Sequence, residues 1–447
     1  MEKIYVVIGG CAAGMSAATQ IRRREPNAKI VVFEKTKFVS YGSCGIPFYI
    51  SGEIKDANSL IVYTPEHFRK VRKIDVYTQT LVEKINTSTK TVEAKNLETG
   101  EKILQEYHRL ILATGGTPKR AVPLKKNVFR VRNLEDGINL KNYLNEKIPK
   151  RVAVIGSGFL GLEMSEAFRK LGMQVFLFEK MSRVLPQFDE EISKIVEKEL
   201  ISNNVSVFKG VAVEFASESE KIIANFNNTH IEVDFVLDAV GVSPEMELIN
   251  GTSIETGKTG AVSVNDRLQT ADPSIFAAGD CIEVKHILTG EKIYIPQGTT
   301  ANKTGRIAGI NASGGSEIFE GVLGTSITKV FSLHAAKTGL GEEEAKKIFP
   351  DVEVETSTSL SKAHYYPGAE KIFTKLIFSK ANGQILGAQM VGKDGVGKRI
   401  DIFATIIYAK MQLKEASRLD LSYNPSVAPV WDPVLRAINK ARQKAEV

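Results

Sequence analysis

The residue best suited to chemistry is Cys44, in the stretch SYGSCGIPFYISG at residues 40–52. Gly42 and Gly45 frame it and Pro47 follows, so the segment is expected to be short and fixed, with the thiol accessible. No second cysteine follows in this stretch to form a dithiol pair. We therefore predict a reacting thiol that works alone. The alternative is a small buried apolar residue.

A glycine-rich turn precedes this stretch and predicts a site for the pyrophosphate of a dinucleotide. Gly9–Gly14 follows an apolar strand expected at residues 4–8 and opens a helix expected at 15–24. The next strand leads to Glu34, about 20 residues beyond the turn, as in dinucleotide-binding βαβ units. Helix N–H groups would bind phosphate, and the carboxylate would accept hydrogen bonds from ribose. The motif is imperfect because Cys11 replaces its middle glycine.

The same pattern recurs in the middle of the chain. A strand expected at residues 151–155 leads into Gly156, Gly158 and Gly161, a complete GxGxxG motif, and the following strand ends at Glu179. Two such units in one chain are far more specific than one, so we expect two dinucleotide sites.

Other apolar strands break at glycines and would complete these units. They occupy residues 110–116 and 236–241, and a third strand at 274–280 ends on Asp280. A helix is expected from Thr299, and the positive end of its dipole could face a developing negative charge.

The pattern changes after about residue 321. Segments 374–378 and 385–390 alternate as antiparallel strands do, and helices are expected at about 399–411 and 433–445. We expect a separate α+β domain here.

Composition limits the class of protein. The chain has 447 residues, 43% of them hydrophobic and 25% charged, which is typical of an ordered globular protein of two or three domains. No apolar run reaches the roughly 18 residues of a transmembrane helix, and we expect no signal peptide. The prediction is a protein that does not enter the membrane.

Charge and cysteine content narrow the class further. The net charge of +7 is spread along the chain without an aromatic-interleaved basic patch, so we expect a solvated surface and no nucleic-acid partner. Three scattered cysteines form neither a disulfide framework nor a metal site, which favours a reducing cytoplasm.

Together these residues resemble the pyridine nucleotide–disulfide oxidoreductases, flavoproteins with two dinucleotide-binding domains, over the whole chain. The single Cys44 is similar to the branch of coenzyme A disulfide reductases, NADH oxidases and NADH peroxidases. The resemblance implies an α/β fold with two Rossmann-like domains and a C-terminal α+β domain that forms a homodimer and completes the partner's active site. The implied boundaries are 1–115 with 245–320 for FAD, 116–244 for NAD(P)H and 321–447 for dimerisation.

The resemblance also assigns cofactor residues. It implies an FAD site formed by Gly9, Cys11, Ala12, Ala13, Gly14, Glu34, Lys35, Thr114, Gly115, Gly279, Asp280, Thr299 and Ala301. It implies an NADH or NADPH site formed by Gly156, Gly158, Phe159, Leu160, Gly161, Glu179, Lys180 and Gly241. Glu179 favours NADH by repelling a 2′-phosphate, but Lys180 and Arg183 nearby would tolerate NADPH, so both stay open.

Coenzyme A is the implied substrate. Gln20, Arg23, Ser40 and Ser43 match positions that line its site in the reductases, Ser43 less well than the others. Tyr365, Tyr366 and Tyr423 lie in motifs similar to those whose tyrosines line the disulfide site. The alternatives are a solvated helix end for Arg23 and interface packing for the tyrosines.

Two absences separate the members of this branch. The peroxidases carry a histidine where this chain has Ala12, which weighs against a peroxidase. No histidine occurs after His364, so the C-terminal histidine base of the larger dithiol reductases is missing and tyrosines are the expected proton donors.

The expected cycle runs through a Cys44–S–S–CoA mixed disulfide, which electrons from NAD(P)H split by way of FAD. The freed thiolate then attacks the next disulfide, so we expect a lowered pKa for Cys44, aided by a helix that starts near Gly45. Polysulfide or sulfur is another possible oxidant. The alternatives are an NADH oxidase with a Cys44 sulfenic acid and an electron-transfer reductase for a protein such as rubredoxin.

Overall fold

The structure is a computed structural model that describes residues 3–123, 126–218 and 221–445. The first unit is built on a five-stranded parallel sheet with strand order β18-β7-β1-β2-β3. Its strands are β1 (Ile4–Ile8), β2 (Lys29–Phe33), β3 (Asp75–Tyr77), β7 (Arg109–Leu112) and β18 (Ile275–Ala277). The inner strands are apolar and almost fully buried, as strands of a parallel sheet covered on both faces must be.

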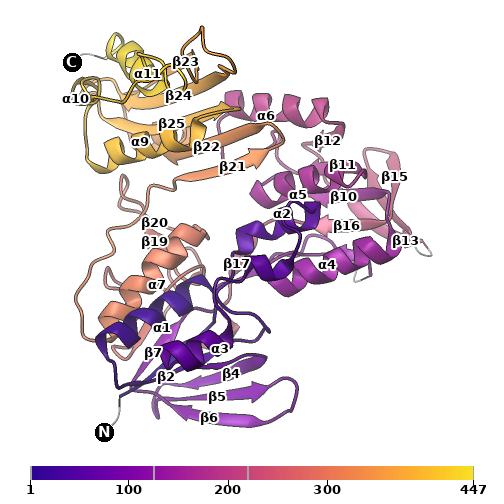
Figure 1. Cartoon of the computed structure of the whole chain (residues 1–447), viewed down its shortest axis with the longest axis vertical. Coiled ribbons are helices and arrows are strands. Elements are labelled where there is room, and N and C mark those ends of the chain that lie inside the picture. Colours follow the sequence, from indigo (N-terminus) through magenta and orange to yellow (C-terminus); the bar gives the residue numbers. More distant parts are fainter. Residues whose placement is uncertain (1–2, 124–125, 219–220, 446–447) are drawn as a thin grey trace.

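Helices α1 (Ala12–Arg24) and α7 (Gly298–Ala312) cover one face of this sheet (Figure 1). They lie in direct backbone contact, because a Cβ built on Gly305 or Gly309 would come within 2.7 Å of the Cα of Ala13 or Ala17. An antiparallel sheet, β4 (Thr80–Asn86), β5 (Thr91–Asn96) and β6 (Lys102–Glu106), shares the same hydrophobic core. Helix α1 starts earlier than predicted because Cys11 is already its N-cap.

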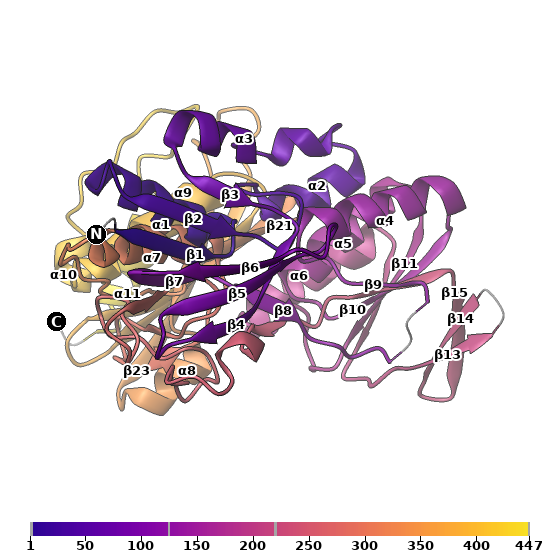
Figure 2. The same ribbon diagram turned by 90° about the horizontal axis from the view of Figure 1, so that it is seen from below.

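The second unit repeats the parallel plan with strand order β12-β11-β10-β16-β9. These strands are β9 (Val128–Phe129), β10 (Arg151–Ile155), β11 (Gln174–Glu179), β12 (Val205–Lys209) and β16 (Phe235–Asp238). Its helices are α4 (Leu134–Lys147), α5 (Phe159–Lys170) and α6 (Glu190–Ser202). A hairpin sheet, β13 (Glu214–Glu218), β14 (Lys221–Phe226) and β15 (Thr229–Val233), lies at its outer end (Figure 2).

The chain passes between the two units at a short antiparallel pair, β8 (Gly116–Pro118) with β17 (Val242–Pro244). A second small pair, β19 (Val284–Lys285) with β20 (Lys292–Ile293), precedes α7.

The last unit is a five-stranded antiparallel sheet with strand order β21-β22-β25-β24-β23. Its strands are β21 (Ser326–Val330), β22 (Leu333–Gly339), β23 (Val352–Leu360), β24 (Lys371–Ser379) and β25 (Ile385–Gly392). Its helices are α8 (Glu342–Ile348), α9 (Val396–Tyr408), α10 (Leu413–Ala416) and α11 (Pro433–Arg442). The predicted fold class, two Rossmann-like units and a C-terminal α+β unit, is confirmed.

The Cys44 segment leaves the first sheet and reaches the second unit. A 3₁₀ turn at Ser43–Gly45 runs into α2 (Ile46–Ser51), whose Ile46 and Ile50 are buried in the core that α4 and α5 share. A Cβ on Gly137 of α4 would come within 2.6 Å of Ile46, so the two helices are close-packed. The segment that follows α2 includes α3 (Pro65–His67). None of the described helices combines the length and apolar character needed to cross a membrane.

Candidate active site

The Cys44 thiol is exposed, whereas Cys281 is buried and Cys11 is partly buried. Its backbone is fixed on both sides. The Gly42 N–H donates to the carbonyl of Leu60 at 2.8 Å, and a Cβ on Gly45 would lie 2.3 Å from the Leu60 side chain. Sequence and structure therefore agree that the thiol is both held in place and accessible.

The electrostatic surroundings of Cys44 differ from the prediction. Desolvation by the surrounding protein and the negative charge of Glu163 raise the pKa of the thiol, and Asp280 acts in the same direction. Ser43 and Arg132 oppose this shift without reversing it. The prediction that the pKa of Cys44 is lowered is therefore wrong, as far as the groups of this chain determine that pKa. Helix α2 has only 6 residues, so its dipole is weak.

The first glycine turn forms a cradle at the carboxyl edge of the first sheet. Gly9 has a φ of +107°, and a Cβ there would lie 2.1 Å from the Ala113 carbonyl oxygen. A Cβ on Gly14 would lie 1.8 Å from the Gly9 carbonyl oxygen, so only glycine fits either position. Cys11 has a φ of −95°, which any residue can adopt, and its thiol is turned toward the Tyr41 carbonyl.

Glu34 fixes this turn from the neighbouring strand. One carboxylate oxygen accepts from the Gly10 N–H at 2.7 Å and the other from the Thr36 N–H and hydroxyl at 2.8 Å. A carboxylate oxygen has two lone pairs, so a ribose hydroxyl can still be accepted. Ala12 and Ala13 open helix α1, and Lys35 is exposed beside the turn.

The remaining residues of the predicted FAD site converge on the same edge. Thr114 and Gly115 follow β7, and Gly279 and Asp280 follow β18. A Cβ on Gly279 would lie 2.9 Å from the Ala13 side chain and 3.7 Å from that of Ala301. The structure thus brings three distant stretches of the chain together. Thr299 lies exposed in the first turn of α7.

Asp280 has a partner that the sequence did not predict. Nη2 of Arg132 lies 2.6 Å from its carboxylate, and Nε of Arg132 donates to the Gly116 carbonyl at 2.9 Å. Arg132 precedes α4, so a cation from the second unit reaches the acidic residue of the first.

The second glycine turn repeats the arrangement of the first. A Cβ on Gly161 would lie 1.9 Å from the Gly156 carbonyl oxygen, while one on Gly158 would meet no described atom within 4 Å. Glu179 accepts from the Ser157 N–H at 2.8 Å and hydroxyl at 2.7 Å. The open side at Gly158 is where a pyrophosphate can approach the backbone.

The other predicted residues of this site lie around the turn. Phe159 and Leu160 start α5, Lys180 is exposed after β11, and Gly241 follows β16 with a φ of +99°. Both turns therefore fit a dinucleotide.

The predicted coenzyme A residues divide into two groups. Gln20 accepts from the guanidinium groups of Arg23 and Arg306 at 3.2 Å each, once its amide is oriented to satisfy both. Ser40 and Ser43 lie instead on the Cys44 segment, beside the first glycine turn and the thiol respectively.

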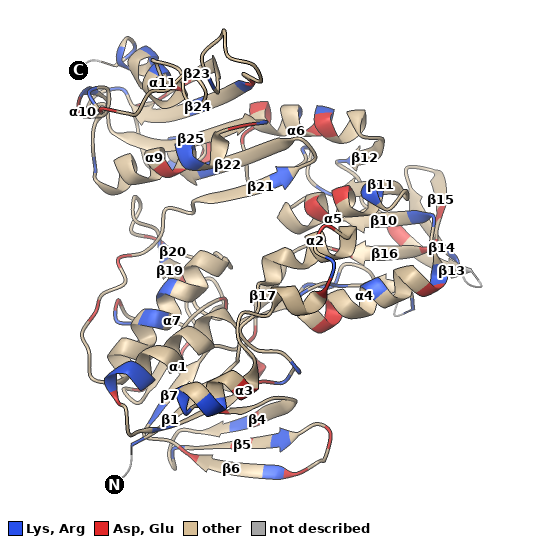
Figure 3. Ribbon diagram, in the orientation of Figure 1, with Lys and Arg blue, Asp and Glu red and all other residues tan. Residues whose placement is uncertain are grey.

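Arg306 of α7 was not predicted, because nothing in the local sequence shows that α7 lies against α1. Figure 3 shows the basic residues of α1, α7 and the α3 segment. Arg22, unlike Arg23, is engaged with backbone, donating to the carbonyls of Arg72, Lys73 and Pro26.

The structure brings two of the three predicted tyrosines together. The hydroxyls of Tyr365 and Tyr423 lie 3.1 Å apart, and both side chains are exposed, as is that of Tyr366. Their hydrogen bond raises the pKa of Tyr423. In Figure 1 the β23–β24 connection that carries Tyr365 lies far from α2 in the same chain. Within one chain the tyrosines therefore do not reach Cys44.

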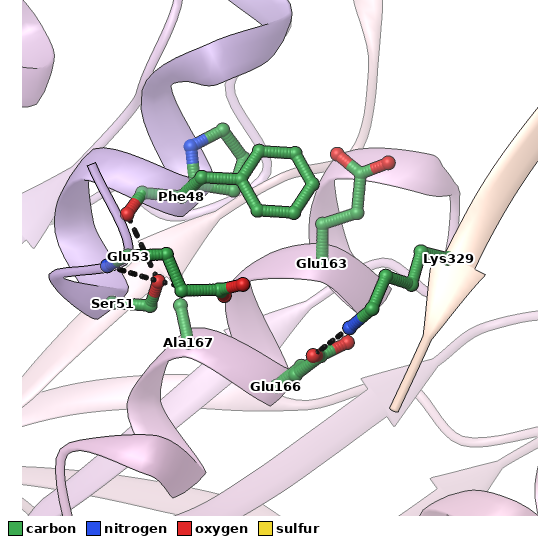
Figure 4. Close-up of a pocket in the computed structure, with 8 residues that line it drawn as sticks. Phe48, Ser51, Glu53, Glu163, Glu166, Ala167 and Lys329 are labelled. Atoms are coloured by element: carbon green, nitrogen blue, oxygen red, sulfur yellow. Dashed lines mark hydrogen bonds and ion pairs between the residues drawn. The ribbon is translucent and has the colours of Figure 1, made fainter. Parts of the chain in front are cut away.

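A small pocket behind α2 contains a carboxyl group that sequence reasoning missed. It lies between α2, α5 and β21, and Figure 4 shows Phe48, Glu163 and Lys329 around it. Burial raises the pKa of Glu163 to about 7, although a hydrogen bond of 3.0 Å from the Thr328 hydroxyl opposes the shift. Lys329 binds the neighbouring Glu166 instead. No group of three or more potential metal ligands occurs among the described residues.

Each of the two parallel sheets carries a glycine turn and an acidic residue at its carboxyl edge, and an exposed thiol lies beside the first sheet. This arrangement is that of a redox protein that binds two nucleotides. Residues 3–305 match the pyridine nucleotide-disulphide oxidoreductase family and residues 325–433 match the dimerisation domain of that family. The chain belongs to this family, whose members use FAD and NAD(P)H.

Individual relatives cover nearly the whole chain. An "NAD(P)H sulfur oxidoreductase (CoA-dependent)" of Pyrococcus furiosus is 38% identical over 97% of this chain and 98% of its own length. An "NADH oxidase" of Methanocaldococcus jannaschii is 34% identical over 98% of both chains. The structure of the reduced CoADR-RHD protein of Bacillus anthracis matches with a TM-score of 0.96 and 36% identity, over 99% of this chain and 80% of that one.

Proposed function

We propose that this chain is an FAD-dependent NAD(P)H oxidoreductase that reduces the disulfide of coenzyme A, or a polysulfide or persulfide of coenzyme A, through Cys44. The observation that carries the proposal is the exposed single thiol of Cys44, on the segment that runs from the first sheet into the core of the second unit. The Pyrococcus furiosus relative is named as CoA-dependent, which supports this substrate class.

The proposal assigns the two turns and divides the chain accordingly. Residues 1–115 and 245–320 hold FAD, residues 116–244 hold NADH or NADPH, and residues 321–447 form the dimer. The β8–β17 pair lies at both crossings between the first two units, which supports this division. The cytoplasm is the proposed location, because the thiol must stay reducible.

Cys44 forms and breaks the covalent bonds of the cycle. Its thiolate attacks one sulfur of the disulfide, forms Cys44–S–S–CoA and releases the other coenzyme A as a thiolate. FAD held at the first glycine turn would supply the route by which two electrons of NAD(P)H reach that mixed disulfide. Splitting it releases the second coenzyme A and restores the Cys44 thiolate. The balance is one disulfide, one NAD(P)H and one proton in, and two thiols and one NAD(P)⁺ out.

The Tyr365–Tyr423 pair supplies the proton for the leaving thiolate. A donor hydroxyl suits this task because the two tyrosines are hydrogen-bonded to each other and exposed to an incoming ligand. Since the pair lies far from Cys44 in its own chain, it serves the Cys44 of the partner subunit. Tyr366 lies in the same loop as Tyr365.

The cations on α1 and α7 recognise the phosphates of coenzyme A. Arg23 and Arg306 approach the same Gln20 oxygen, so their positive charges are held close together at the surface. An anion between them would relieve this repulsion. Ser40 and Ser43 would guide the pantetheine arm toward the thiol.

Two other activities make different predictions. An NADH oxidase is supported by the Methanocaldococcus relative. It would pass Cys44 through a sulfenic acid and need no coenzyme A. A reductase for a small electron-carrier protein would need a docking surface and would retain its activity after Cys44→Ser.

The test is mass spectrometry of the native protein without reductant, together with turnover of Cys44→Ser. We expect an adduct with the mass of coenzyme A on Cys44, lost on addition of thiol. Cys44→Ser should lose coenzyme A disulfide reduction by at least about 100-fold while NADH still bleaches the flavin. Cys281→Ser is the matched control and should keep its activity. An unmodified Cys44 with fast oxygen-dependent turnover and none on coenzyme A disulfide would overturn the proposal.

A further inference from the structure

A buried ion pair joins the bases of two loops, the Tyr365 loop between β23 and β24 (residues 361–370) and the Tyr423 loop between α10 and α11 (residues 417–432). Nε of Arg399, on α9, lies 2.8 Å from Oδ2 of Asp432, the residue that precedes α11. Both side chains are only 8% exposed. A buried pair of this kind is costly to break, because either partner left alone is an uncompensated charge.

The same guanidinium group holds the base of the Tyr365 loop. Its Nη2 donates to the carbonyl of Ser361 at 2.9 Å, and Ser361 is the first residue after β23. Its Nη1 donates to the Gly395 carbonyl at 3.1 Å. Arg399 therefore has little freedom to move without releasing this loop.

Asp432 holds the end of the Tyr423 loop. Its Oδ1 accepts from the Val434 N–H at 2.9 Å and caps α11, while Oδ2 binds Arg399. The loops also touch directly, since the Ala363 N–H donates to the Pro425 carbonyl at 3.2 Å. One ion pair thus ties the bases of both loops, and the exposed tyrosine hydroxyls meet at their far ends.

We propose that Arg399 and Asp432 are positioning residues for the Tyr365–Tyr423 pair and set its catalytic geometry through the bases of the two loops. The inference rests on the proposed function, in which this pair protonates the leaving coenzyme A thiolate. In the single chain Tyr365 and Tyr423 are 63% and 48% exposed, so the core of their own subunit does not fix them. Their 3.1 Å contact depends on the loops.

Asp432→Asn in the FAD-loaded enzyme tests this inference. Asparagine keeps an oxygen that can cap α11 but removes the charge that holds Arg399. We expect kcat with coenzyme A disulfide to fall about tenfold or more, with the rate of flavin reduction by NADH unchanged. Lys398→Ala, next to Arg399 on α9, removes a side chain that is 96% exposed and should leave kcat unchanged.

A double-mutant cycle separates positioning from general loosening of the fold. If Asp432 acts through the tyrosines, Asp432→Asn should cause no further loss of kcat in a Tyr423→Phe background. Equal losses in both backgrounds, or a native kcat for Asp432→Asn, would overturn the inference and leave the proposed function standing.

Two further results are decisive. A native kcat for Tyr423→Phe would refute the proposed role of the tyrosines, and the inference with it. If Asp432→Asn yields no folded holoenzyme, Arg399→Lys tests the same point, because lysine keeps the charge but loses the planar group whose separate nitrogens bind Asp432, Ser361 and Gly395. Arg399→Lys should then lower kcat about tenfold and cause no further loss in the Tyr423→Phe background. A native kcat for Arg399→Lys would overturn the inference.

Discussion

Glu163 is the residue whose ionisation the fold perturbs most clearly near Cys44. Burial raises its pKa to about 7 from an ordinary 4.5, and the nearby Glu166 adds to the shift, whereas Thr328 and Lys329 oppose it. Because Glu163 in turn raises the pKa of the Cys44 thiol, its protonation favours the Cys44 thiolate. The ionisation of each group therefore depends on the charge of the other.

Glu163→Gln should change how stability depends on pH. The folded state binds the proton of Glu163 more tightly than the unfolded chain does, so this carboxyl favours folding at low pH. The cost of ionising it grows from about pH 4.5 to about pH 7 and is constant above, reaching at most about 3 kcal/mol. The variant avoids this cost, so its unfolding temperature should exceed the native one increasingly as the pH rises through that range.

The matched control for this prediction is Glu53→Gln in the same pocket. The Glu53 side chain is 46% exposed, and its hydrogen bond from Lys170 lowers its pKa instead. The unfolding temperature of Glu53→Gln should not rise above the native one as the pH increases. A difference between native protein and Glu163→Gln that stays constant from pH 5 to pH 8 would contradict the assignment.

These residues show where sequence reasoning succeeds at the residue scale. The glycine turns were predictable because the backbone itself allows only glycine at Gly9 and Gly14. The pKa of Cys44 was not, because Glu163 comes from a different unit and its own partner Thr328 lies 165 residues further along the chain. The spacing of residues in the sequence does not indicate such contacts.

At the scale of elements, a buried lysine joins the second unit to the C-terminal sheet. Nζ of Lys375, on β24, lies 2.7 Å from Glu342, 2.8 Å from Glu191 and 3.1 Å from Asp189. Glu191 and Glu342 lie in the first turns of α6 and α8, where their charges also suit the helix dipoles. Burial alone would lower the pKa of Lys375, but these carboxylates raise it above its ordinary value.

Lys375→Met should weaken the contact between α6, α8 and β24. It removes a buried cation from three carboxylates that are 11%, 44% and 28% exposed. Because these partners are partly in water, we expect a cost between those of surface and buried pairs, about 1–3 kcal/mol. We expect a lower unfolding temperature and faster hydrogen exchange in the first turns of α6 and α8.

Lys371→Met is the matched control, since Lys371 lies on the same strand but is exposed. It should change stability by less than about 0.5 kcal/mol. Equal effects of the two substitutions would show that the cluster does not hold the units together.

The elements themselves were largely predictable, with ends displaced by a few residues. The helix expected at 399–411 is α9 (Val396–Tyr408), because hydrophobic periodicity marks a buried face but not the turn at which a helix begins. The Arg399–Asp432 pair could not be predicted, since it joins the start of α9 to the residue before α11 through the folded core.

At the scale of the whole molecule, the proposed site is divided between chains. Cys44 and the two nucleotide turns belong to the first two units, while Tyr365 belongs to the β23–β24 connection of the C-terminal unit, which lies away from α2 (Figure 1). Tyr423 contacts Tyr365. Residues 325–433 match a dimerisation domain. In the proposed two-fold dimer, the C-terminal unit of each subunit would lie against the first two units of the other. A two-fold axis then produces two identical composite sites.

Mixed dimers test this division directly. In a dimer of one Cys44→Ser chain and one Tyr423→Phe chain, a shared site pairs the intact Cys44 of the second chain with the intact Tyr423 of the first. Refolding an equal mixture of the two weakly active variants should therefore restore about a quarter of the native turnover of coenzyme A disulfide. If each site were built within one chain, every site would carry a substitution and mixing would restore nothing. Mixing Cys44→Ser with a Cys44→Ser/Tyr423→Phe chain is the control and should stay inactive in either case, because neither chain has the thiol.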